Sequence, residues 1–327
     1  MANATVSRLG LVNNTGTNFD ELFLKVFSGE VLTSFTRNNI FNEQLHSVRT
    51  ISSGKSASFP VLGTATAAYH SVGTPLVGAN QIKANEKIIT IDDLLISQAF
   101  VAQIDELKNH YDVRATYADE LGKALAKQYD INVAKVIANA SRTSTTLSGG
   151  NGGTVLTLAN GNTNSAAVTG DELAAAIYDI AQTFDERDIP TTDRFCVLPP
   201  AEYYKLAETA TRTVDTDFNP QGNGSFASGK IQQIAGIPVM MSNSVPQTNR
   251  SAVTGENNTY SGDDSKTIGL VFHKSAVGTV KLMDMKTEIS GSDYNLMYQG
   301  TLMIAKYLLG HGVLRPECAA TIKLSAS

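Results

Sequence analysis

The stretch that decides the fold is YDVRATYADELGKALAKQYDINVAKVIANAS, at residues 111–141. Its apolar residues recur at intervals of three and four, which is the period of one face of an α-helix. The stripe consists of Val113, Tyr117, Leu121, Ala124, Leu125, Tyr129, Val133, Val136, Ile137 and Ala140. At a rise of 1.5 Å per residue the helix would be about 45 Å long. The glycine-rich segment 141–154 that follows is predicted to end the helix and to mark a domain boundary.

Two strands are expected on the N-terminal side of this helix, SASFPVLG at 56–63 and EKIITID at 86–92. In the second, Ile89 and Ile91 fall on the same face of the strand. About two dozen residues connect the strands, whereas a hairpin loop usually has 2–5. If the strands pair, they form a projecting two-stranded ribbon, which is marginally stable by itself in water. A neighbouring subunit is the natural surface for such a ribbon.

The remaining sequence predicts a polar extended arm followed by a mixed α/β region. The arm covers residues 1–20, and a helix or two should follow at 21–37, with a short amphipathic piece at 94–107. Beyond residue 154, helices are expected from the capping box at 169–172 to before Pro190, and at 201–210. Strands are expected at 194–198, 237–242, 267–273, 278–289 and the C-terminus. Residues 247–266 are predicted to be a polar loop with almost no core-forming residues.

The amino-acid composition favours some classes of function and argues against others. Charged residues make up 17% of the 327 residues, against about 25% in typical soluble domains. A surface so poor in charge suits a chain that packs against copies of itself, although a surface rich in Asn, Ser and Thr would give the same figure. The net charge of −5 and the lack of a basic run argue against tight nucleic-acid binding. No stretch has the length of a membrane span or the pattern of a signal peptide, so a cytoplasmic protein is expected.

The sequence contains no complete motif for nucleotide binding, metal binding or catalysis. Ser53–Ser56 resembles the end of a phosphate-binding loop, but Arg49 stands where that motif needs its first glycine. The two cysteines, Cys196 and Cys318, show no metal or disulfide spacing. The five histidines are scattered without metal-ligand spacing, and most are interpreted as surface or hydrogen-bonded structural residues: His46, His70, His110, His273 and His311. The acidic pairs at 92–93 and 263–264 are interpreted as cap or loop residues. We therefore expect no catalytic, cofactor or metal site.

Six ordered segments resemble one family. They are LFLKVFSGEVLTSF (22–35), VRTISSGKSASFPVLG (48–63), EKIITIDDLL (86–95), NHYDVRATYADELGKALA (109–126), HKSAVGTVKL (273–282) and IAKYLLGHGVLRPE (304–317). Together they resemble the major capsid proteins of T-seven-type podoviruses, which are short-tailed bacteriophages. The segments are long and spread over most of the chain. The region 211–265 matches least.

The resemblance implies an α+β chain with the Hong Kong-97-type capsid fold. The parts of that fold are then assigned as follows: N-terminal arm and short helices at 1–47, E-loop at 48–92, P-domain at 93–164 with its spine helix at 111–141, A-domain at 165–266, and a return through the A- and P-domains at 267–327. The expected site of contact between subunits is the E-loop, through Tyr69, His70, Lys83, Glu86 and Lys87.

The function implied is that of a non-enzymatic shell subunit. Copies would form hexamers and pentamers of an icosahedral head that encloses double-stranded DNA without sequence-specific binding. A separate scaffolding protein and a portal at one vertex are the expected partners, with no membrane and no cofactor. The protein would be assembled in the bacterial cytoplasm and end in the virion. Two alternatives stay open, an encapsulin-like compartment and a soluble α/β enzyme.

Overall fold

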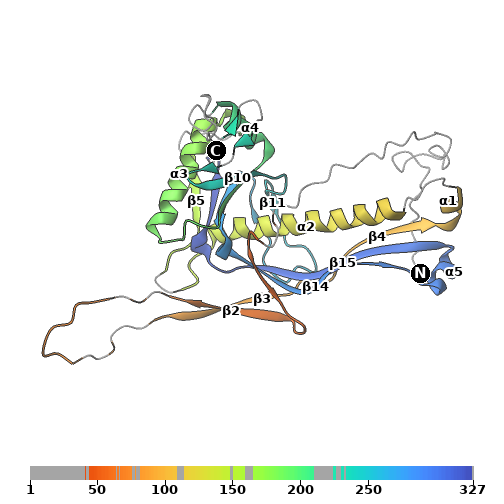
Figure 1. Ribbon diagram of the computed structural model, residues 1–327, viewed down its shortest axis with the longest axis horizontal. Coiled ribbons are helices and arrows are strands. Elements are labelled where there is room, and N and C mark those ends of the chain that lie inside the picture. The colour runs from red at the N-terminus through yellow and green to blue at the C-terminus, as the bar shows by residue number, and fades with distance from the viewer. Residues whose placement is uncertain are drawn as a thin grey trace. The chain divides into compact units, whose positions relative to one another are not determined.

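The computed structural model describes residues 41, 44–63, 65, 67–75, 78, 82–108, 114–147, 150–158, 165–209, 224–225, 230–231 and 233–325. The chain forms two compact units (Figure 1). Of the described residues, unit 1 holds 93–108, 114–129 and 283–309, and unit 2 holds the rest. Three elements run without a break from one unit into the other: α2 (Arg114–Arg142), β14 (Val277–Ile289) and β15 (Gly300–Val313).

Unit 1 is built on an antiparallel pair of strands. β4 (Leu95–Ala102) pairs with β15 from Leu95↔Tyr307 to Ala102↔Gly300. The short helices α1 (Gln103–Lys108) and α5 (Ser292–Tyr298) complete the unit. Leu125 of α2 packs in a cluster with Ala305, Tyr307 and Leu309 of β15. The piece expected at 94–107 is thus mostly a strand, because LISQAFVA alternates between more and less exposed positions along β4.

Unit 2 contains a mixed sheet. Within the described residues six strands lie in the order β5-β16-β13-β6-β10-β9. Their bounds are β5 Thr154–Thr157, β16 Ala319–Lys323, β13 Thr267–His273, β6 Arg194–Leu198, β10 Ile237–Met241 and β9 Gln233–Ile234. β13 is antiparallel to both of its neighbours, whereas β10 lies parallel to β6 and β5 parallel to β16. Thr267 to Phe272 are all buried, so β13 is covered on both faces and forms the centre of the core.

Helix α3 (Gly170–Glu186) begins as the sequence predicts. The Thr169 hydroxyl accepts from the Glu172 backbone N–H at 3.4 Å, and the Glu172 carboxylate accepts from the Thr169 N–H at 3.1 Å. This reciprocal capping box satisfies two N–H groups that the first helical turn leaves open. The buried stripe that follows is Leu173, Ile177, Ile180 and Phe184. Helix α4 (Pro200–Thr209) lies beside α3 in the same unit (Figure 1).

The other described elements of unit 2 are further paired strands and 3-10 turns. They are β1 (Ser47–Thr50), parallel to β14; β2 (Ser56–Leu62) with β3 (Ala84–Thr90); β7 (Gly224–Ser225) with β8 (Lys230–Ile231); β11 (Asn249–Arg250) with β12 (Gly262–Asp263); and the 3-10 turns Ser165–Ala167, Lys274–Ala276 and Pro316–Cys318. The expected pairing of the strands near 56–63 and 86–92 is confirmed.

The long helix is also confirmed as α2, with residues 111–113 outside the described part of the chain. The arm at 1–20 and the helix at 21–37 lie outside it too. The prediction that 247–266 contributes almost nothing to the core is wrong. Tyr260 is only 1% exposed and is among the largest fully buried side chains, while Asp264 is fully buried. No helix in the described ranges is both long and apolar enough to cross a membrane.

Candidate functional site

The candidate site is the β2–β3 ribbon together with the residues that hold its base. β2 and β3 are antiparallel, in register from Ser56↔Thr90 to Leu62↔Ala84. Because side chains alternate along a strand, the ribbon has two faces. One face is buried through Ala57, Val61 and Ile89. The opposite face leaves Leu62 68% exposed and Ile88 59% exposed. A ribbon with one covered face and one open apolar face suits contact with a further surface.

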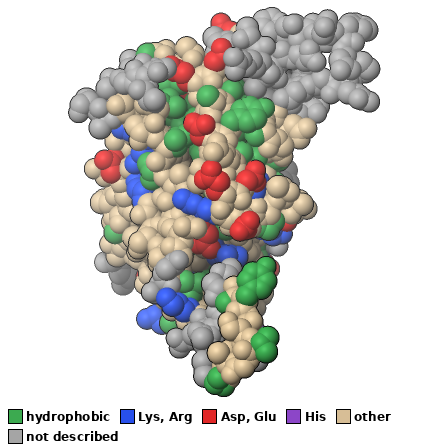
Figure 2. All heavy atoms as spheres, turned by 90° about the vertical axis from the view of Figure 1, so that its left-hand side faces the viewer, with side chains coloured by type: hydrophobic (Ala, Val, Ile, Leu, Met, Phe, Trp, Pro, Cys, Tyr) green, Lys and Arg blue, Asp and Glu red, His purple; other side chains and the backbone are tan. Residues whose placement is uncertain are grey.

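The connection between β2 and β3 is exposed at every described residue from 65 to 83. Tyr69 and Val72 are the extreme cases, with exposed fractions of 107% and 100%. Figure 2 shows hydrophobic side chains standing open along this loop, which faces the viewer at the lower edge. Large apolar side chains without any covering are unfavourable in water. An uncovered apolar surface of this kind is typical of an element that contacts another molecule.

The five residues predicted for contact are strung along the ribbon and are not gathered at one point. Tyr69 and His70 lie in the exposed loop. Lys83 ends the loop, where its carbonyl accepts from the Gly63 N–H at 2.8 Å. Glu86 is exposed on β3 and Lys87 is half-buried. The five side chains thus lie along an extended strip, and Lys87 also lines a hollow beside β3.

The base of the ribbon is held by two consecutive asparagines. The Asn258 side chain accepts from the Thr90 N–H at 3.2 Å and donates to the Thr90 carbonyl at 2.6 Å. Asn257 donates through its side chain to the Ile91 carbonyl at 2.7 Å, and its backbone N–H donates to Asp92 Oδ1 at 2.8 Å. These polar contacts fix the end of β3 to the segment between β11 and β12.

Asp92 extends this contact into the interior of unit 2. Tyr260 Oη donates to Asp92 Oδ2 at 2.5 Å and accepts from the His311 backbone N–H at 2.9 Å. Burial raises the pKa of Asp92, although its hydrogen bonds oppose the shift. Burial also raises the pKa of Tyr260, and the Asp92 carboxylate adds to that effect. Tyr260 therefore stays protonated and acts as a fixed link between the base of β3 and β15.

His311 is a buried neutral histidine on β15. Its Nδ1 lies 2.8 Å from Thr279 Oγ1 of β14. Complete burial is the main cause that lowers the pKa of His311 to about 3, with repulsion from His46 and Lys281 adding to it. The interpretation of the histidines as structural is confirmed for His311. His273 is likewise structural, because its Nδ1 accepts from the Ser275 N–H at 3.2 Å.

The shifted pKa of His311 predicts acid sensitivity. The unfolded chain binds a proton below about pH 6.5, while the folded chain does so only near its pKa of about 3. The free energy of unfolding should therefore fall as pH drops between these values, by up to about 1.4 kcal/mol per pH unit. Urea denaturation of the unassembled subunit between neutral pH and pH ~5 measures this slope.

The matched variant for that experiment is His311→Asn, which keeps a polar side chain but does not titrate. Its stability should depend less steeply on pH than that of the unaltered protein. The comparison separates His311 from Asp92, whose raised pKa acts in the opposite direction. Identical slopes for the two proteins would contradict the assignment.

Glycines let β15 pass very close to the base of the ribbon. A Cβ added at Gly310 would lie 2.1 Å from the Thr90 carbonyl oxygen and 3.0 Å from Ile91 Cα. A Cβ at Gly312 would lie 2.8 Å from Ile89 Cγ1. Only glycine permits this approach, so the sequence GHG at 310–312 sets the distance between β3 and β15.

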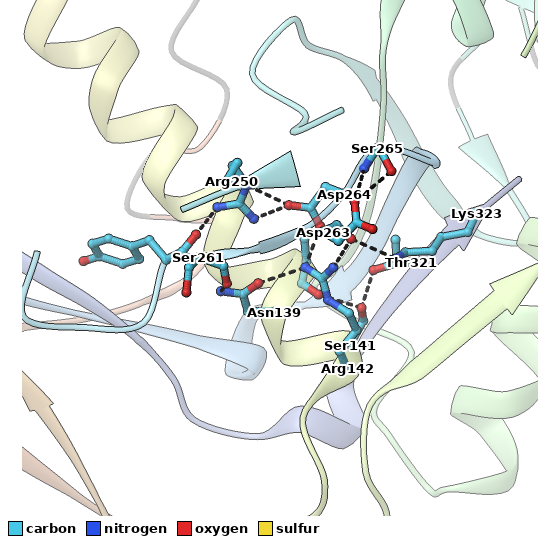
Figure 3. Close-up of polar contacts among 12 residues, drawn as sticks. Asn139, Ser141, Arg142, Arg250, Ser261, Asp263, Asp264, Ser265, Thr321 and Lys323 are labelled. Atoms are coloured by element: carbon cyan, nitrogen blue, oxygen red, sulfur yellow. Dashed lines mark hydrogen bonds and ion pairs between the residues drawn. The ribbon is translucent and has the colours of Figure 1, made fainter. Parts of the chain in front are cut away.

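Besides the contacts at the base of the ribbon, a second polar cluster is centred on Asp264 (Figure 3). Asp264 is fully buried and forms ion pairs with Arg142, at 2.5 Å, and with Arg250. Arg250 Nε also donates to Asp264 Oδ2 at 2.7 Å, and its Nη1 donates to the Tyr260 carbonyl. Asn139 donates to the Ser261 carbonyl at 3.1 Å. The C-terminal end of α2 is thereby tied to the hairpin that carries Tyr260 and the two asparagines.

Sequence reasoning missed both clusters. It treated the acidic pairs as ordinary loop residues, and no contact role was assigned to Asp92 or Asp264. The available signal was Tyr260, a single large aromatic residue inside an otherwise polar segment. A phenol ring in such a segment tends to be buried with its hydroxyl hydrogen-bonded.

A hollow of about 750 Å³ opens between β3, the C-terminal end of α2, the 257–263 segment and β15. Its charged lining residues are Lys87, Arg142, Asp263 and Lys323. Polar groups of Asn139, Thr143, Asn257 and Asn258 line much of the rest. In the described part of the chain no group of histidine, cysteine and acidic residues could hold a metal ion.

Comparison with known proteins identifies the family to which the chain belongs. The family described as "Gp10A-like: Major capsid protein" matches residues 58–323. The chain is 34% identical over 334 residues to the major capsid protein of Escherichia phage T7, covering 92% of this chain and 91% of that one. It is 33% identical over 324 residues to the major capsid protein of Enterobacteria phage T3, covering 93% and 91%.

Solved structures of phage capsids also match this chain. The capsid structure of cyanophage P-SCSP1u matches with a TM-score of 0.84 and 49% identity over 100% of both chains. The mature capsid of bacteriophage PhiM1 matches with a TM-score of 0.73 and 20% identity, covering 98% of this chain and 97% of that one, which shows the shared fold.

Fold and sequence together define a bacteriophage capsid protein with the Hong Kong-97-type fold. Within that class the chain belongs to the Gp10A-like family of major capsid proteins. It is a structural subunit of a phage capsid shell, as the resemblance of the six sequence segments implies.

Proposed function

We propose that this subunit closes into an icosahedral head by laying its E-loop, the β2–β3 ribbon and its connection, across a neighbouring copy. The observation that carries this proposal is the complete exposure of Tyr69 and Val72 on a loop that is exposed at every described position. Burial of an apolar side chain of this size contributes about 1.5–3 kcal/mol. Repeated over many subunits, such contacts would favour the closed shell.

The proposed contacts run along the whole strip. Tyr69 would supply apolar area, and His70 a polar rim. Lys83, Glu86 and Lys87 alternate in charge near the root of the ribbon, which would fix the register against the neighbour. The assignment of 48–92 as E-loop, 93–164 as P-domain, 165–266 as A-domain and 267–327 as the returning segment belongs to the same proposal.

The wider assembly is proposed on chemistry and family membership. Hexamers and pentamers of the chain would form the shell in the bacterial cytoplasm, with a separate scaffolding protein and a portal at one vertex. The net charge of −5 favours a wall that encloses double-stranded DNA without binding its sequence. No enzymatic activity is part of this proposal, since the site described consists of structural contacts.

The test is the double variant Tyr69→Ser with Val72→Ser. Both side chains are already in water in the single subunit, so the stability of the fold should change by less than about 0.5 kcal/mol. Shell formation should fall by roughly tenfold or more, because the buried apolar area between subunits is lost. Electron microscopy and sedimentation of the assembled fraction measure the yield.

The matched control is Tyr178→Ser on α3, where the removed tyrosine is 58% exposed but lies away from the loop in sequence and structure. It should assemble like the unaltered protein. Normal shells from the double variant would overturn the proposal. A loss of thermal stability in the double variant alone would show that the loop serves the fold instead.

A further inference from the structure

The loop between α2 and β5 contains an asparagine, Asn151, that is followed directly by Gly152. Asparagine is a thermolabile residue, because the backbone nitrogen of the next residue can attack its side-chain carbonyl. A glycine at that next position has no Cβ and wide conformational freedom, so it lets the nitrogen approach. Two further Asn–Gly pairs, at 160–161 and 223–224, include residues outside the described ranges. The pair at 151–152 is therefore the one whose surroundings can be described.

The two groups that would react are open. The Asn151 side chain is exposed, and within the described residues it has no hydrogen-bond partner. The Gly152 N–H likewise has no partner there. The next amide along the chain differs, because the Gly153 N–H donates to the Thr143 carbonyl at 3.0 Å. No hydrogen bond in the described chain therefore has to break before the Gly152 nitrogen meets the Asn151 side chain.

The local charge also favours the reaction. The attacking group is the Gly152 nitrogen after it has lost its proton, so it carries a negative charge. Arg187 Nη1 donates to the carbonyl of the same glycine at 3.0 Å and to the Glu317 carbonyl at 3.3 Å. These two bonds hold a guanidinium group beside Gly152. A nearby positive charge stabilises the deprotonated form of a group.

Other asparagines of unit 2 lack this combination. The side-chain amides of Asn85, Asn257 and Asn258 all donate hydrogen bonds to backbone carbonyls. They are followed by Glu86, Asn258 and Thr259, each of which has a Cβ. Their amides must first give up a hydrogen bond, and the nitrogen that would attack is more crowded. These three asparagines are internal controls for Asn151.

We propose that Asn151 is a site of spontaneous modification, at which the side-chain amide is converted to a mixture of aspartate and isoaspartate. The Gly152 nitrogen gives its proton to hydroxide and forms a bond to Cγ of Asn151. The bond between Cγ and Nδ2 breaks, and ammonia leaves with a proton taken from water. Water then opens the cyclic imide at either carbonyl. One water is consumed and one ammonia is released, with no oxidant or reductant.

The product alters a loop that holds the ribbon. Asn85 Nδ2, at the start of β3, donates to the Thr146 carbonyl at 2.6 Å. Each conversion at Asn151 adds one negative charge to a chain whose net charge is −5. The isoaspartate form also adds a methylene group to the backbone of this loop. We expect the longer backbone to disturb the loop and to lower the thermal midpoint of the subunit.

The test is timed incubation of the purified, unassembled subunit at mildly alkaline pH, with a parallel sample unfolded in urea. Trypsin releases residues 143–187 as one peptide, and electron-transfer fragmentation separates Asn151 from Asn160 and distinguishes isoaspartate from aspartate. Digestion in heavy-oxygen water marks any conversion that occurs during the digest. Conversion at Asn151 in the folded subunit should be within roughly tenfold of its rate in the unfolded chain. The rate should fall at mildly acidic pH, where fewer amide nitrogens are deprotonated.

The matched variant is Asn151→Gln, whose longer side chain closes the imide ring far more slowly. It should fold like the unaltered subunit, because the Asn151 side chain is exposed and makes no described hydrogen bond. After equal incubation, isoelectric focusing should show one more acidic species in the unaltered subunit than in Asn151→Gln. The thermal midpoint should fall with age in the unaltered subunit and fall less in the variant.

A folded subunit that keeps Asn151 intact while the urea-unfolded chain converts it would overturn the proposal. Conversion of Asn257 or Asn258 at the same rate as Asn151 would overturn the role given to the local structure. Equal thermal midpoints for the aged unaltered subunit and aged Asn151→Gln would overturn the effect on the loop. All of these measurements use unassembled subunits, so their outcome is independent of the proposed contacts between copies.

Discussion

Replacing Asp264 by alanine is expected to lower the free energy of unfolding by about 3–5 kcal/mol, because it leaves two guanidinium groups without their shared carboxylate. The Asp264 side chain is fully buried, and the Arg250 side chain is only 10% exposed. Arg142, at 25% exposure, can regain some hydration. Most of the loss therefore comes from Arg250, whose charge would remain in a poorly hydrated position. Urea denaturation of the unassembled subunit, followed by circular dichroism, measures the change.

The neighbouring Asp263→Ala is the control for Asp264→Ala. Asp263 accepts from the Ser265 N–H and hydroxyl at 3.1 and 2.7 Å, and these bonds lower the pKa of Asp263. Its side chain is exposed, so alanine there should cost far less. Asp264→Asn should fall between the two, because the amide oxygen still accepts a hydrogen bond but carries no charge. Equal stability for the alanine variants at 263 and 264 would contradict the role of the buried carboxylate.

Replacing Gly310 by alanine should cost about 1–3 kcal/mol or more, as overpacking of a closely packed site does. The new Cβ would meet the Thr90 carbonyl at 2.1 Å, and this obstacle is backbone that cannot rotate away. β15 and the base of β3 must separate to admit it. That movement should also weaken the contacts of Asn258 with Thr90, so the variant is expected to assemble poorly as well as to melt earlier.

Gly291→Ala is the matched change for Gly310→Ala. Gly291 precedes α5 with φ of −75°, and no atom lies within 4 Å of an added Cβ. Alanine should fit there with little effect on stability. The thermal midpoint and the yield of shells are measured for both variants. If Gly310→Ala behaves like Gly291→Ala, the close approach of β15 to β3 is not required by the protein.

The elements of the fold were predictable where the pattern was local and repeated. The apolar stripe of α2 spans many turns, and Thr169 and Glu172 form a capping box that needs only four residues of sequence. β3 was predictable because Ile89 and Ile91 fall on one face of a short run that is rich in β-branched residues. In each case the physical cause is the period of the element itself.

The clusters at the base of the ribbon could not be predicted in the same way. Asp92 and Asn258 are 166 residues apart, and Arg142 and Asp264 are 122 apart. Each residue is of a type that is common in turns, so none carries a local signal for its partner. Their roles come from chain topology, which brings the loop before β12 onto both β3 and the end of α2. The five contact residues of the E-loop stay a prediction.

The continuity of α2, β14 and β15 through both units has a consequence for the inheritance of this protein. Each unit is composed of stretches from distant parts of the gene, and three elements belong to both. Replacing one whole unit by a single contiguous block of a related gene would therefore also replace part of the other unit. A crossover at either boundary inside α2, β14 or β15 would join two halves of one helix or strand from different parents.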